Sequence, residues 1–512
     1  MANKLETNLI LAPLAGFALI LVLWSTPHGV GLRPDSFDYL SAAENFARGD
    51  GLGRWTGSGE FRPLTHFPPL YPMMIGMLRL AGMDILAAAR LGNAVLFGAL
   101  IVLAWVAVRL MSGSATLALL ASIIVATSDV LIYRYSMALS EPLFLVLALG
   151  GSIALAQFLR RGSLPSLAVS SILFALASLT RYMGLTFLLA GWILILIQPR
   201  AARRQKLGAS LAYLSVALLP LVWWWLRNLA LTGNPVDRAL AFHFPTSSNL
   251  KMLAISVFSW LFPEEYLAGL SRLPLLLLDG FIVLLTGGLI LWMFSGKLRK
   301  DGLSALLTGL ELVLLVGAAS YSTALLISLS FVDRLTPLDN RILAPLYLNL
   351  GLLVMVGLSR LWSRIRRAGR ILVAAACGTL IFAHAVKAQA VFGGLRSDGQ
   401  GYASLAWQNS PTMTYVTALP PVPIYTNDIV AVYFLGGRVA SFIPTDYNPA
   451  TDTLRTDYPE WLATMRRRML KEDAVLVLFG PDPLPIDPEQ LAQLTEGLKL
   501  VERFQDGAVY RH

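Results

Sequence analysis

Long apolar segments recur along this chain and decide how the rest of it can be organised. Eleven such segments approach or reach the length of about 20 residues that a helix needs to cross the core of a bilayer. They lie at residues 8–26, 86–108, 115–132, 138–158, 165–180, 184–198, 207–227, 273–295, 303–330, 342–359 and 371–388. The pattern predicts an all-α polytopic membrane protein.

Composition agrees with this interpretation. The chain has 512 residues, of which 56% are hydrophobic and 14% charged, whereas a soluble chain would carry about a quarter charged residues. The net charge of +10 comes from basic residues in short loops between apolar segments, so it does not indicate a nucleic-acid partner. The single cysteine, Cys377, lies in an apolar segment and excludes an intrachain disulfide.

Four basic loops indicate the orientation. They all fall on one side of the predicted spans, which the positive-inside rule makes cytoplasmic. Their residues are Arg160 and Arg161; Arg200, Arg203, Arg204 and Lys206; Lys297, Arg299 and Lys300; and Arg360, Arg364, Arg366, Arg367 and Arg370. Eleven spans then place the N-terminus in the cytoplasm and the C-terminus outside. The first apolar segment lacks a good cleavage site after it, so we expect it to be a retained helix.

Three segments on the outer side are too long to be simple connectors: residues 27–85, 228–272 and 389–512. We expect a membrane domain over residues 1–388, with 27–85 as its first outside loop, and a separate domain over 389–512. In that last segment charges and turn residues return. Two short apolar strands and two helices alternate there, at 423–426, 474–479, 458–470 and 488–498, which predicts a small extracytoplasmic α/β domain.

The first outside loop concentrates polar residues, and its two acids are the first catalytic candidates. Asp35 and Asp38 stand three apart at the start of a predicted helix, so both can face the same way. A carboxylate beside a membrane can take a proton from an acceptor hydroxyl or amine, and it can also bind a metal. The alternative is that Asp35 caps the helix through its side-chain oxygen.

The same loop contains a histidine and two arginines with open roles. His66 precedes Pro68-Pro69 and is either a metal or phosphate ligand or a loop histidine without a role. Arg54 and Arg62 suit bidentate phosphate binding, and they suit anchoring at the membrane interface equally well.

Further charged residues stand at the outer ends of later spans. Glu141 follows shortly after Arg134, and the two either pair or leave Glu141 to line a cavity. Helix N-terminal placement of Glu141 before a proline is the simpler alternative. Arg181 and Arg341 break the positive-inside pattern, and arginines on the outer side suit a phosphate at the membrane boundary or a simple aromatic or carboxylate partner.

These features, in this order, resemble the polytopic GT-C glycosyltransferases, and most closely the bacterial mannosyltransferase-like group that includes protein O-mannosyltransferases and the lipid A aminoarabinose transferase. The resemblance covers residues 8–360. It is carried by the acid soon after the first span, the Pro-Pro-Leu-Tyr-Pro turn at 68–72, Ser-Glu-Pro-Leu-Phe at 140–144, Leu-Thr-Arg-Tyr at 179–182, and Asn-Arg at 340–341 before Pro345.

The resemblance implies an inverting transfer of a sugar from a polyprenyl-phosphate donor to a lipid, glycan or protein acceptor. It places the reaction on the outer face of the inner (cytoplasmic) membrane. The general base falls on Asp35, with Asp38 as its alternative, and Glu141 matches a second acidic position. The remaining matched residues are Arg62, Arg134, Arg181 and Arg341 for the donor phosphate, and His66, Tyr71, Tyr182 and Asn340 for the substrates.

The chain departs from the aminoarabinose transferases just before the Pro-Pro turn. Those enzymes have an acid and a lysine there, where this sequence has His66 and Phe67. A divalent metal at Asp35 and His66 and a metal-independent site both stay open.

Three other classes of protein compete with a glycosyltransferase. A transporter or flippase of lipid-linked sugars is the main alternative, although such proteins usually show inverted repeats with interrupted helices, and none is seen. A polysaccharide polymerase or ligase would place its large outside loop late among the spans. A scaffold without catalysis, whose C-terminal domain binds a partner, fits the composition as well.

Overall fold

A computed structural model of the chain describes residues 2–199, 201–238, 242–262, 272–332, 336–448, 453–481, 484 and 486–512. The chain divides into two compact units. We call them the helical unit (Met1–Ser25, Thr65–Tyr71 and Arg90–Gly394) and the mixed unit (Thr26–Leu64, Pro72–Ala89 and Leu395–His512). Parts of the predicted second outside segment, residues 239–241 and 263–271, lie outside the described residues.

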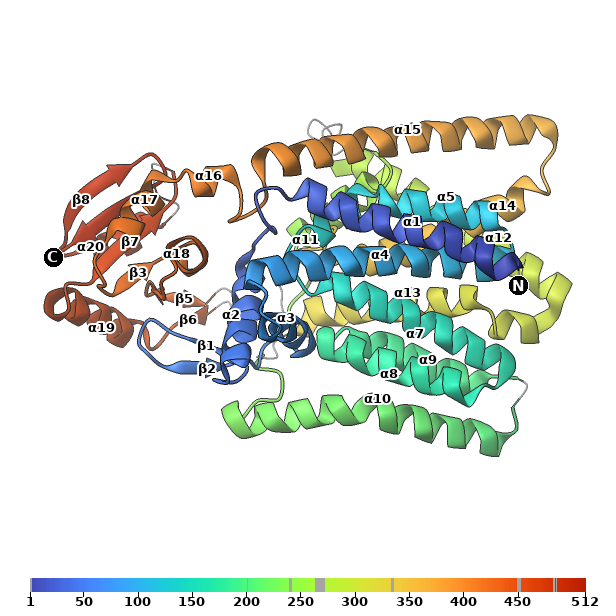
Figure 1. The fold of residues 1–512 in the computed structure, drawn as a ribbon, viewed down its shortest axis with the longest axis horizontal. Coiled ribbons are helices and arrows are strands. Elements are labelled where there is room, and N and C mark those ends of the chain that lie inside the picture. The colour runs from blue at the N-terminus through green and yellow to red at the C-terminus, as the bar shows by residue number, and fades with distance from the viewer. Residues whose placement is uncertain are drawn as a thin grey trace. The chain divides into compact units, whose positions relative to one another are not determined.

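The helical unit consists of long helices that run beside one another (Figure 1). They are α1 (Ala2–Ser25), most of α4 (Ile85–Ser112), α5 (Ala115–Ala126), α6 (Asp129–Tyr135), α7 (Glu141–Arg161), α8 (Leu164–Thr180), α9 (Gly184–Ile197), α10 (Arg203–Thr232), α11 (Ser247–Ser259), α12 (Arg272–Leu307), α13 (Leu310–Phe331), α14 (Ala344–Trp362) and most of α15 (Arg367–Asp398).

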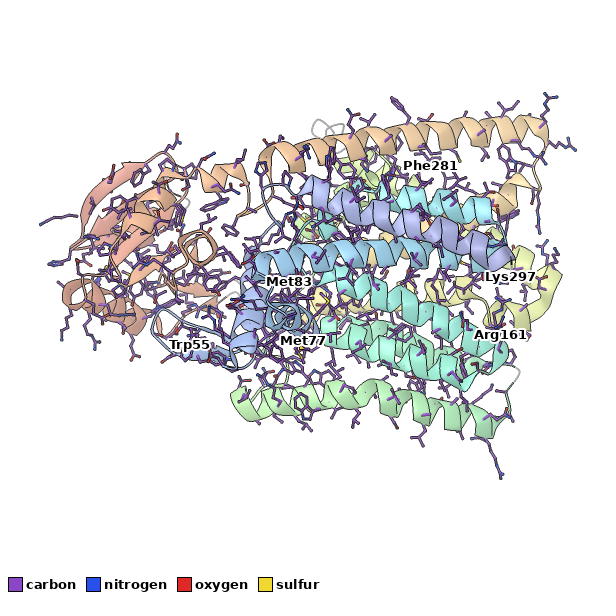
Figure 2. All side chains as sticks on the ribbon, in the orientation of Figure 1. Trp55, Met77, Met83, Arg161, Phe281 and Lys297 are labelled. Atoms are coloured by element: carbon purple, nitrogen blue, oxygen red, sulfur yellow. The ribbon has the colours of Figure 1, made fainter. Side chains whose placement is uncertain are left out.

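Seven helices in the described part of the chain are long and apolar enough to cross a membrane: α4, α7, α10, α12 from Gly280–Leu307, α13, α14 and α15. The bent pair α5 and α6 makes an eighth if it counts as one span. Most of these helices expose large apolar side chains, among them Phe281 on α12, labelled in Figure 2, which is 56% exposed. The protein is therefore a multi-pass membrane protein. Each of the eleven predicted spans falls on a helix or on the bent pair, and their exact number stays a prediction.

The predicted single span over residues 115–132 is wrong in one respect, because the helix breaks within it. α5 ends at Ala126, and α6 begins at Asp129 at an angle of 59° to it. The hydroxyl of Ser128 accepts a hydrogen bond from the backbone N–H of Leu131 at 3.3 Å, which caps the new helix. Two adjacent hydroxyl residues, Thr127 and Ser128, thus interrupt an otherwise apolar segment.

Small residues let the neighbouring helices of this unit approach closely. A side chain at Gly151 on α7 would meet the ring of Phe174 on α8 at 2.7 Å, and one at Gly191 on α9 would meet the hydroxyl of Tyr213 on α10 at 2.4 Å. The hydroxyl of Ser170 also donates to the carbonyl of Gly151 at 3.0 Å. Such contacts are the usual basis of helix association in a bilayer, where burial of apolar surface gives little.

The mixed unit combines short helices with β-structure. Its elements are α2 (Pro34–Arg48), β1 (Gly53–Trp55), β2 (Phe61–Pro63), most of α3 (Leu70–Leu80), α16 (Leu405–Gln408), α17 (Pro411–Ala418), β3 (Ile424–Thr426), α18 (Ile429–Gly436), β4 (Ser441–Phe442), β5 (Tyr447–Asn448), β6 (Thr453–Leu454), α19 (Tyr458–Lys471), β7 (Val475–Phe479), α20 (Pro488–Thr495), β8 (Lys499–Phe504) and β9 (Gly507–Arg511).

A five-stranded sheet in the order β4-β3-β7-β9-β8 forms the core of this unit. β3 pairs in parallel with β4 and β7, while β9 pairs antiparallel with β7 and β8. The central strand β7 is buried along its whole length, because apolar clusters cover both of its faces. This explains why its sequence is continuously apolar. The predicted strands at 423–426 and 474–479 and the predicted helices at 458–470 and 488–498 are confirmed, with small shifts at their ends.

The first loop and the C-terminal segment belong to the same compact unit. Phe37 on α2 packs edge-on against the ring of Tyr433 on α18, with ring centres 5.0 Å apart. The predicted division into residues 1–388 and 389–512 stays a prediction, whereas compactness groups most of residues 27–85 with the C-terminal segment.

Candidate catalytic site

A buried carboxylate at the start of α7 gathers arginines from distant loops of the helical unit. Arg181 Nη1 lies 2.7 Å from Glu141 Oε1, and Arg341 Nε lies 3.1 Å from the same oxygen. The Glu141 side chain is only 4% exposed. Arg134, also buried, lies within electrostatic range of this carboxylate. We call these four residues the glutamate–arginine cluster.

Local structure holds each member of this cluster in place. α7 begins at Glu141 with Pro142 next, where the missing N–H of proline leaves no donor unsatisfied. Arg181 is the extended C-cap residue of α8, and its guanidinium also donates to the hydroxyl of Ser140 at 3.1 Å. The loop before α14 holds Arg341 because Asp339 Oδ1 accepts a hydrogen bond from its backbone N–H at 2.9 Å.

The glutamate–arginine cluster carries more positive than negative charge. It holds three guanidinium groups and one carboxylate, and the carboxylate of Asp339 lies next to it, on the backbone N–H of Arg341. The side chains of Arg181 and Arg341 are 17% and 18% exposed, so both remain partly accessible. An anion with several acceptor oxygens, such as a phosphate, would complete this arrangement.

Tyr182 belongs to a second polar group in the helical unit. Its hydroxyl donates to the carbonyl of Thr65 at 3.4 Å and accepts a hydrogen bond from Trp224 Nε1 at 3.2 Å. The amide of Asn228 donates to the carbonyl of Thr65 at 3.3 Å. Burial raises the pKa of Tyr182, so its hydroxyl stays protonated and serves as a donor. These contacts hold the backbone of Thr65, the residue directly before His66, in place.

The surroundings of His66 do not fit a divalent cation. Its Nδ1 lies 3.4 Å from the carbonyl oxygen of Asp237, and its Nε2 lies 3.2 Å from the guanidinium Nη2 of Arg238. A histidine with an N–H toward the carbonyl must accept at Nε2, which therefore faces a positive group. Among the described residues there is no group of three His, Cys, Asp or Glu residues that could hold a metal ion.

Tyr71 and Asn340 occupy defined positions in the helical unit. Tyr71 is fully buried, and its hydroxyl donates to Asn93 Oδ1 at 3.4 Å. Asn340 donates to the hydroxyl of Ser259 at 2.8 Å and accepts from Trp260 Nε1 at 2.9 Å. Asn340 thus ties the loop that carries Arg341 to the end of α11.

One charged residue near Asn340 was not among the predicted site residues. Lys387 on α15 is buried, lies 3.0 Å from Asp129 Oδ2 and donates to the carbonyl of Ser259. It lies within the predicted span at 371–388. A lysine inside an apolar segment is costly without a partner, and that signal would have been enough to single it out.

The mixed unit contains Asp35, Asp38 and Arg62. α2 begins at Pro34 after the N-cap residue Arg33, so Asp35 does not cap the helix, and that alternative is wrong. Asp38 Oδ1 lies 2.9 Å from Arg54 Nε. Burial raises the pKa of the Asp38 carboxyl, and the negative charge of Asp35 acts in the same direction, while Arg54 opposes both. Arg62 stands on β2, directly opposite Arg54 in the antiparallel register.

Comparison with known proteins places this arrangement in a known fold. No family model matches the chain, and no curated protein matches its sequence. Among solved structures, ArnT from Cupriavidus metallidurans in the apo state is similar over 100% of this chain and 98% of that one, with a TM-score of 0.58 and 14% identity. The same enzyme bound to undecaprenyl phosphate is similar over 98% and 97%, with a TM-score of 0.55 and 15% identity.

A third similar structure comes from an archaeon. The oligosaccharyltransferase AglB from Archaeoglobus fulgidus, in complex with an inhibitory peptide and a dolichol-phosphate, matches 93% of this chain and 70% of its own. Its TM-score is 0.55 and its identity 11%. Likeness at such identities establishes the fold, and the chain has the GT-C fold that the motifs in its sequence resemble.

Proposed function

We propose that this protein is an inverting glycosyltransferase that moves a sugar from a polyprenyl-phosphate donor to an acceptor on the outer face of the cytoplasmic membrane. The fold supports the enzyme class. The structures of similar fold that carry undecaprenyl phosphate and a dolichol-phosphate support the class of donor.

The observation that carries this proposal is the gathering of three arginines around Glu141, two of them partly accessible. A polyprenyl-phosphate sugar releases a lipid phosphate, whose negative charge grows as the bond to the sugar breaks. Guanidinium groups held in advance stabilise such a charge without reorganising. In this proposal Arg181 and Arg341 bind the departing phosphate, Arg134 adds to the field, and Glu141 positions the two guanidinium groups.

The acids of α2 supply the base in this proposal. Asp35 removes a proton from the acceptor hydroxyl or amine, which attacks the anomeric carbon while the carbon–oxygen bond to the phosphate breaks. This single displacement inverts the anomeric centre. Asp38 is the alternative base, because its raised pKa brings it nearer to the operating pH.

A transfer assay tests the class of reaction and the base together. Membranes from cells with and without the gene would receive a panel of radiolabelled polyprenyl-phosphate sugars, and released polyprenyl phosphate would be measured together with labelled product. We expect release only with the gene, and a loss of roughly 10²–10⁴-fold for Asp35→Asn at equal expression. If Asp38→Asn abolishes transfer and Asp35→Asn does not, Asp38 is the base.

The same assay tests the phosphate site with a matched pair of arginines. Arg341→Gln should lower kcat/KM by roughly 10²–10³-fold. Arg161→Gln, at the exposed far end of α7, should leave it unchanged. If no donor supports transfer and the protein moves lipid-linked sugar across liposome membranes, the glycosyltransferase proposal is rejected in favour of a transporter.

A further inference from the structure

A cleft of about 750 Å³ lies wholly within the mixed unit, and the function proposed above gives no role to the residues that line it. The β1–β2 hairpin lines it together with α19 and residues around β4. On α19 and its two cap residues the lining positions are spaced by three or four residues, so they share one face of the helix. They are Asp457, Trp461, Thr464, Arg468 and Glu472.

Positive charge dominates the lining of this cleft. It contains four arginines, Arg54, Arg62, Arg455 and Arg468, against two acids. Arg468 is engaged by Glu472 at 2.9 Å, and Arg54 by Asp38 at 2.9 Å.

The other two arginines have no such partner. Within the described part of the chain, neither Arg62 nor Arg455 forms an ion pair, and the Nε of Arg455 is buried without a hydrogen-bond acceptor. An acidic ligand in the cleft would supply an acceptor for this donor.

Aromatic rings stand beside these two cations. Trp461 is half-buried with the guanidinium of Arg455 5.7 Å from its ring centre, and Phe442 on β4 is 43% exposed. The face of an aromatic ring carries partial negative charge, so it packs well against the C–H bonds on one face of a sugar ring. A bare inorganic anion would make no use of these rings.

The walls of the cleft are held together by close contacts. The turn of the β1–β2 hairpin approaches β4 so closely that a side chain at Gly57 would meet Ser441 Oγ at 2.4 Å and Ser441 N at 2.5 Å. Arg468 Nη1 also donates to the carbonyl of Gly57 at 3.2 Å. The cleft is therefore a formed feature of one compact unit, built from segments far apart in the sequence.

We infer that this cleft binds an acidic saccharide, meaning a sugar that carries phosphate or carboxylate groups. Arg62 and Arg455 suit these groups because a guanidinium binds two oxygens of a carboxylate or phosphate at once. The volume lies in the range of small-molecule sites and accommodates more than one sugar ring. That this saccharide is the acceptor rests on the proposed function, whereas its binding does not.

Binding is measured on the purified full-length protein in nanodiscs by titration calorimetry. The probes are trigalacturonate and glucose 6-phosphate, which separate carboxylate from phosphate recognition, with maltotriose as the neutral saccharide and inorganic phosphate as the bare anion. We expect at least one acidic sugar to bind at least tenfold more tightly than maltotriose and inorganic phosphate.

Variants locate the binding site in the cleft. Arg455→Gln should weaken acidic-sugar binding at least tenfold, because a hydrogen bond between a guanidinium and a charged oxygen is among the strong ones. Arg62→Gln should weaken binding by the same factor. The Arg62 side chain is exposed, so folding of the protein does not depend on its guanidinium. The control is Arg467→Gln, an exposed arginine on α19 that does not line the cleft and should leave affinity unchanged.

Trp461→Leu separates saccharide binding from anion binding, because it should weaken the acidic sugars and leave inorganic phosphate unaffected. Equal binding of maltotriose, an equal loss in Arg467→Gln, or no binding of either acidic sugar would overturn the inference. Sugar transfer measured in the same preparation keeps the two proposals apart. Binding without transfer would reject the acceptor role and keep the binding site. Transfer without binding would reject the binding site and keep the glycosyltransferase proposal.

Discussion

Glu141 organises its surroundings by charge rather than by packing. Its carboxylate is the shared partner of Arg181 and Arg341, which come from loops before α9 and α14. A buried ion pair is weak evidence for net stability, because desolvation offsets much of the attraction. Removing one partner is a different matter, since the remaining charges stay buried alone.

Glu141→Gln should therefore destabilise the protein strongly, by about 3–5 kcal/mol. The measurement is the apparent thermal unfolding midpoint of the detergent-solubilised protein, followed by size-exclusion chromatography after heating. Glu60→Gln, at an exposed position in the β1–β2 turn, is the matched control and should leave the midpoint unchanged. A midpoint for Glu141→Gln equal to that of the control would mean that the arginines do not depend on this carboxylate.

At the scale of elements, tight turns decide which helices can pack together. α8 and α9 are joined by a short turn in which Gly184 approaches the backbone of the preceding helix. A side chain there would meet Ser178 N at 2.4 Å and the carbonyl carbon of Ala177 at 2.5 Å. Since both obstacles are backbone atoms, no rotamer change relieves the clash. The same turn carries Arg181 and Tyr182, so its geometry also positions candidate site residues.

We expect Gly184→Ala to cost about 1–3 kcal/mol or more, the usual range for overpacking, and to lower transfer activity with it. Gly288→Ala on α12 is the control, because a side chain there meets nothing within 4 Å. Gly288 lies in the interior of α12, where alanine favours the helix more than glycine does, so Gly288→Ala should not lower the unfolding midpoint. Equal unfolding midpoints would show that the α8–α9 turn relaxes more easily than its backbone contacts suggest.

At the scale of the whole molecule, charge at one end of the helical unit bears on its orientation. Glu311 on α13 pairs with Lys297 on α12 at 2.8 Å and with Arg360 on α14 at 2.6 Å. These three residues line a cavity together with Arg160 and Arg161. Basic residues of α7, α12 and α14 therefore gather at this end, which the positive-inside rule predicts to be cytoplasmic.

Single-cysteine labelling checks this orientation. In a Cys377→Ser background, we expect a membrane-impermeant maleimide to label Glu60→Cys in cells whose inner membrane is intact. Arg161→Cys should be labelled only after the inner membrane is disrupted. Both positions are exposed in the structure. The reverse pattern would invert the topology and place the first loop in the cytoplasm.

The sequence predicted features that depend on local pattern and missed those that depend on distant contacts. Apolar segments located the helices, and continuous apolarity located β7, because burial acts on each residue of such a segment. The sequence did not predict the break at Thr127 and Ser128, because two hydroxyl residues seldom end a span by themselves. The contact between Phe37 and Tyr433 could not be predicted, as no local pattern links positions so far apart.

In the candidate site, too, local patterns predicted single residues, whereas contacts between distant segments were not predicted. The motif order placed Glu141, Arg181 and Arg341 at outer span ends, and the structure brings these three together. The pairing itself did not follow from spacing, because the three residues come from separate loops. Lys387 was predictable from its charge within an apolar segment, whereas the cleft beside Trp461 depends on two remote segments and was not.

The composition of the mixed unit has a consequence for biosynthesis. Its first segment, Thr26–Leu64, leaves the ribosome long before its last segment, Leu395–His512, which supplies all strands of the five-stranded sheet. Because domains generally fold as units, Phe37 on α2 stays without its partner Tyr433 until α18 has been synthesised. A nascent chain that stops before α18 would therefore carry α2 without the aromatic partner of Phe37.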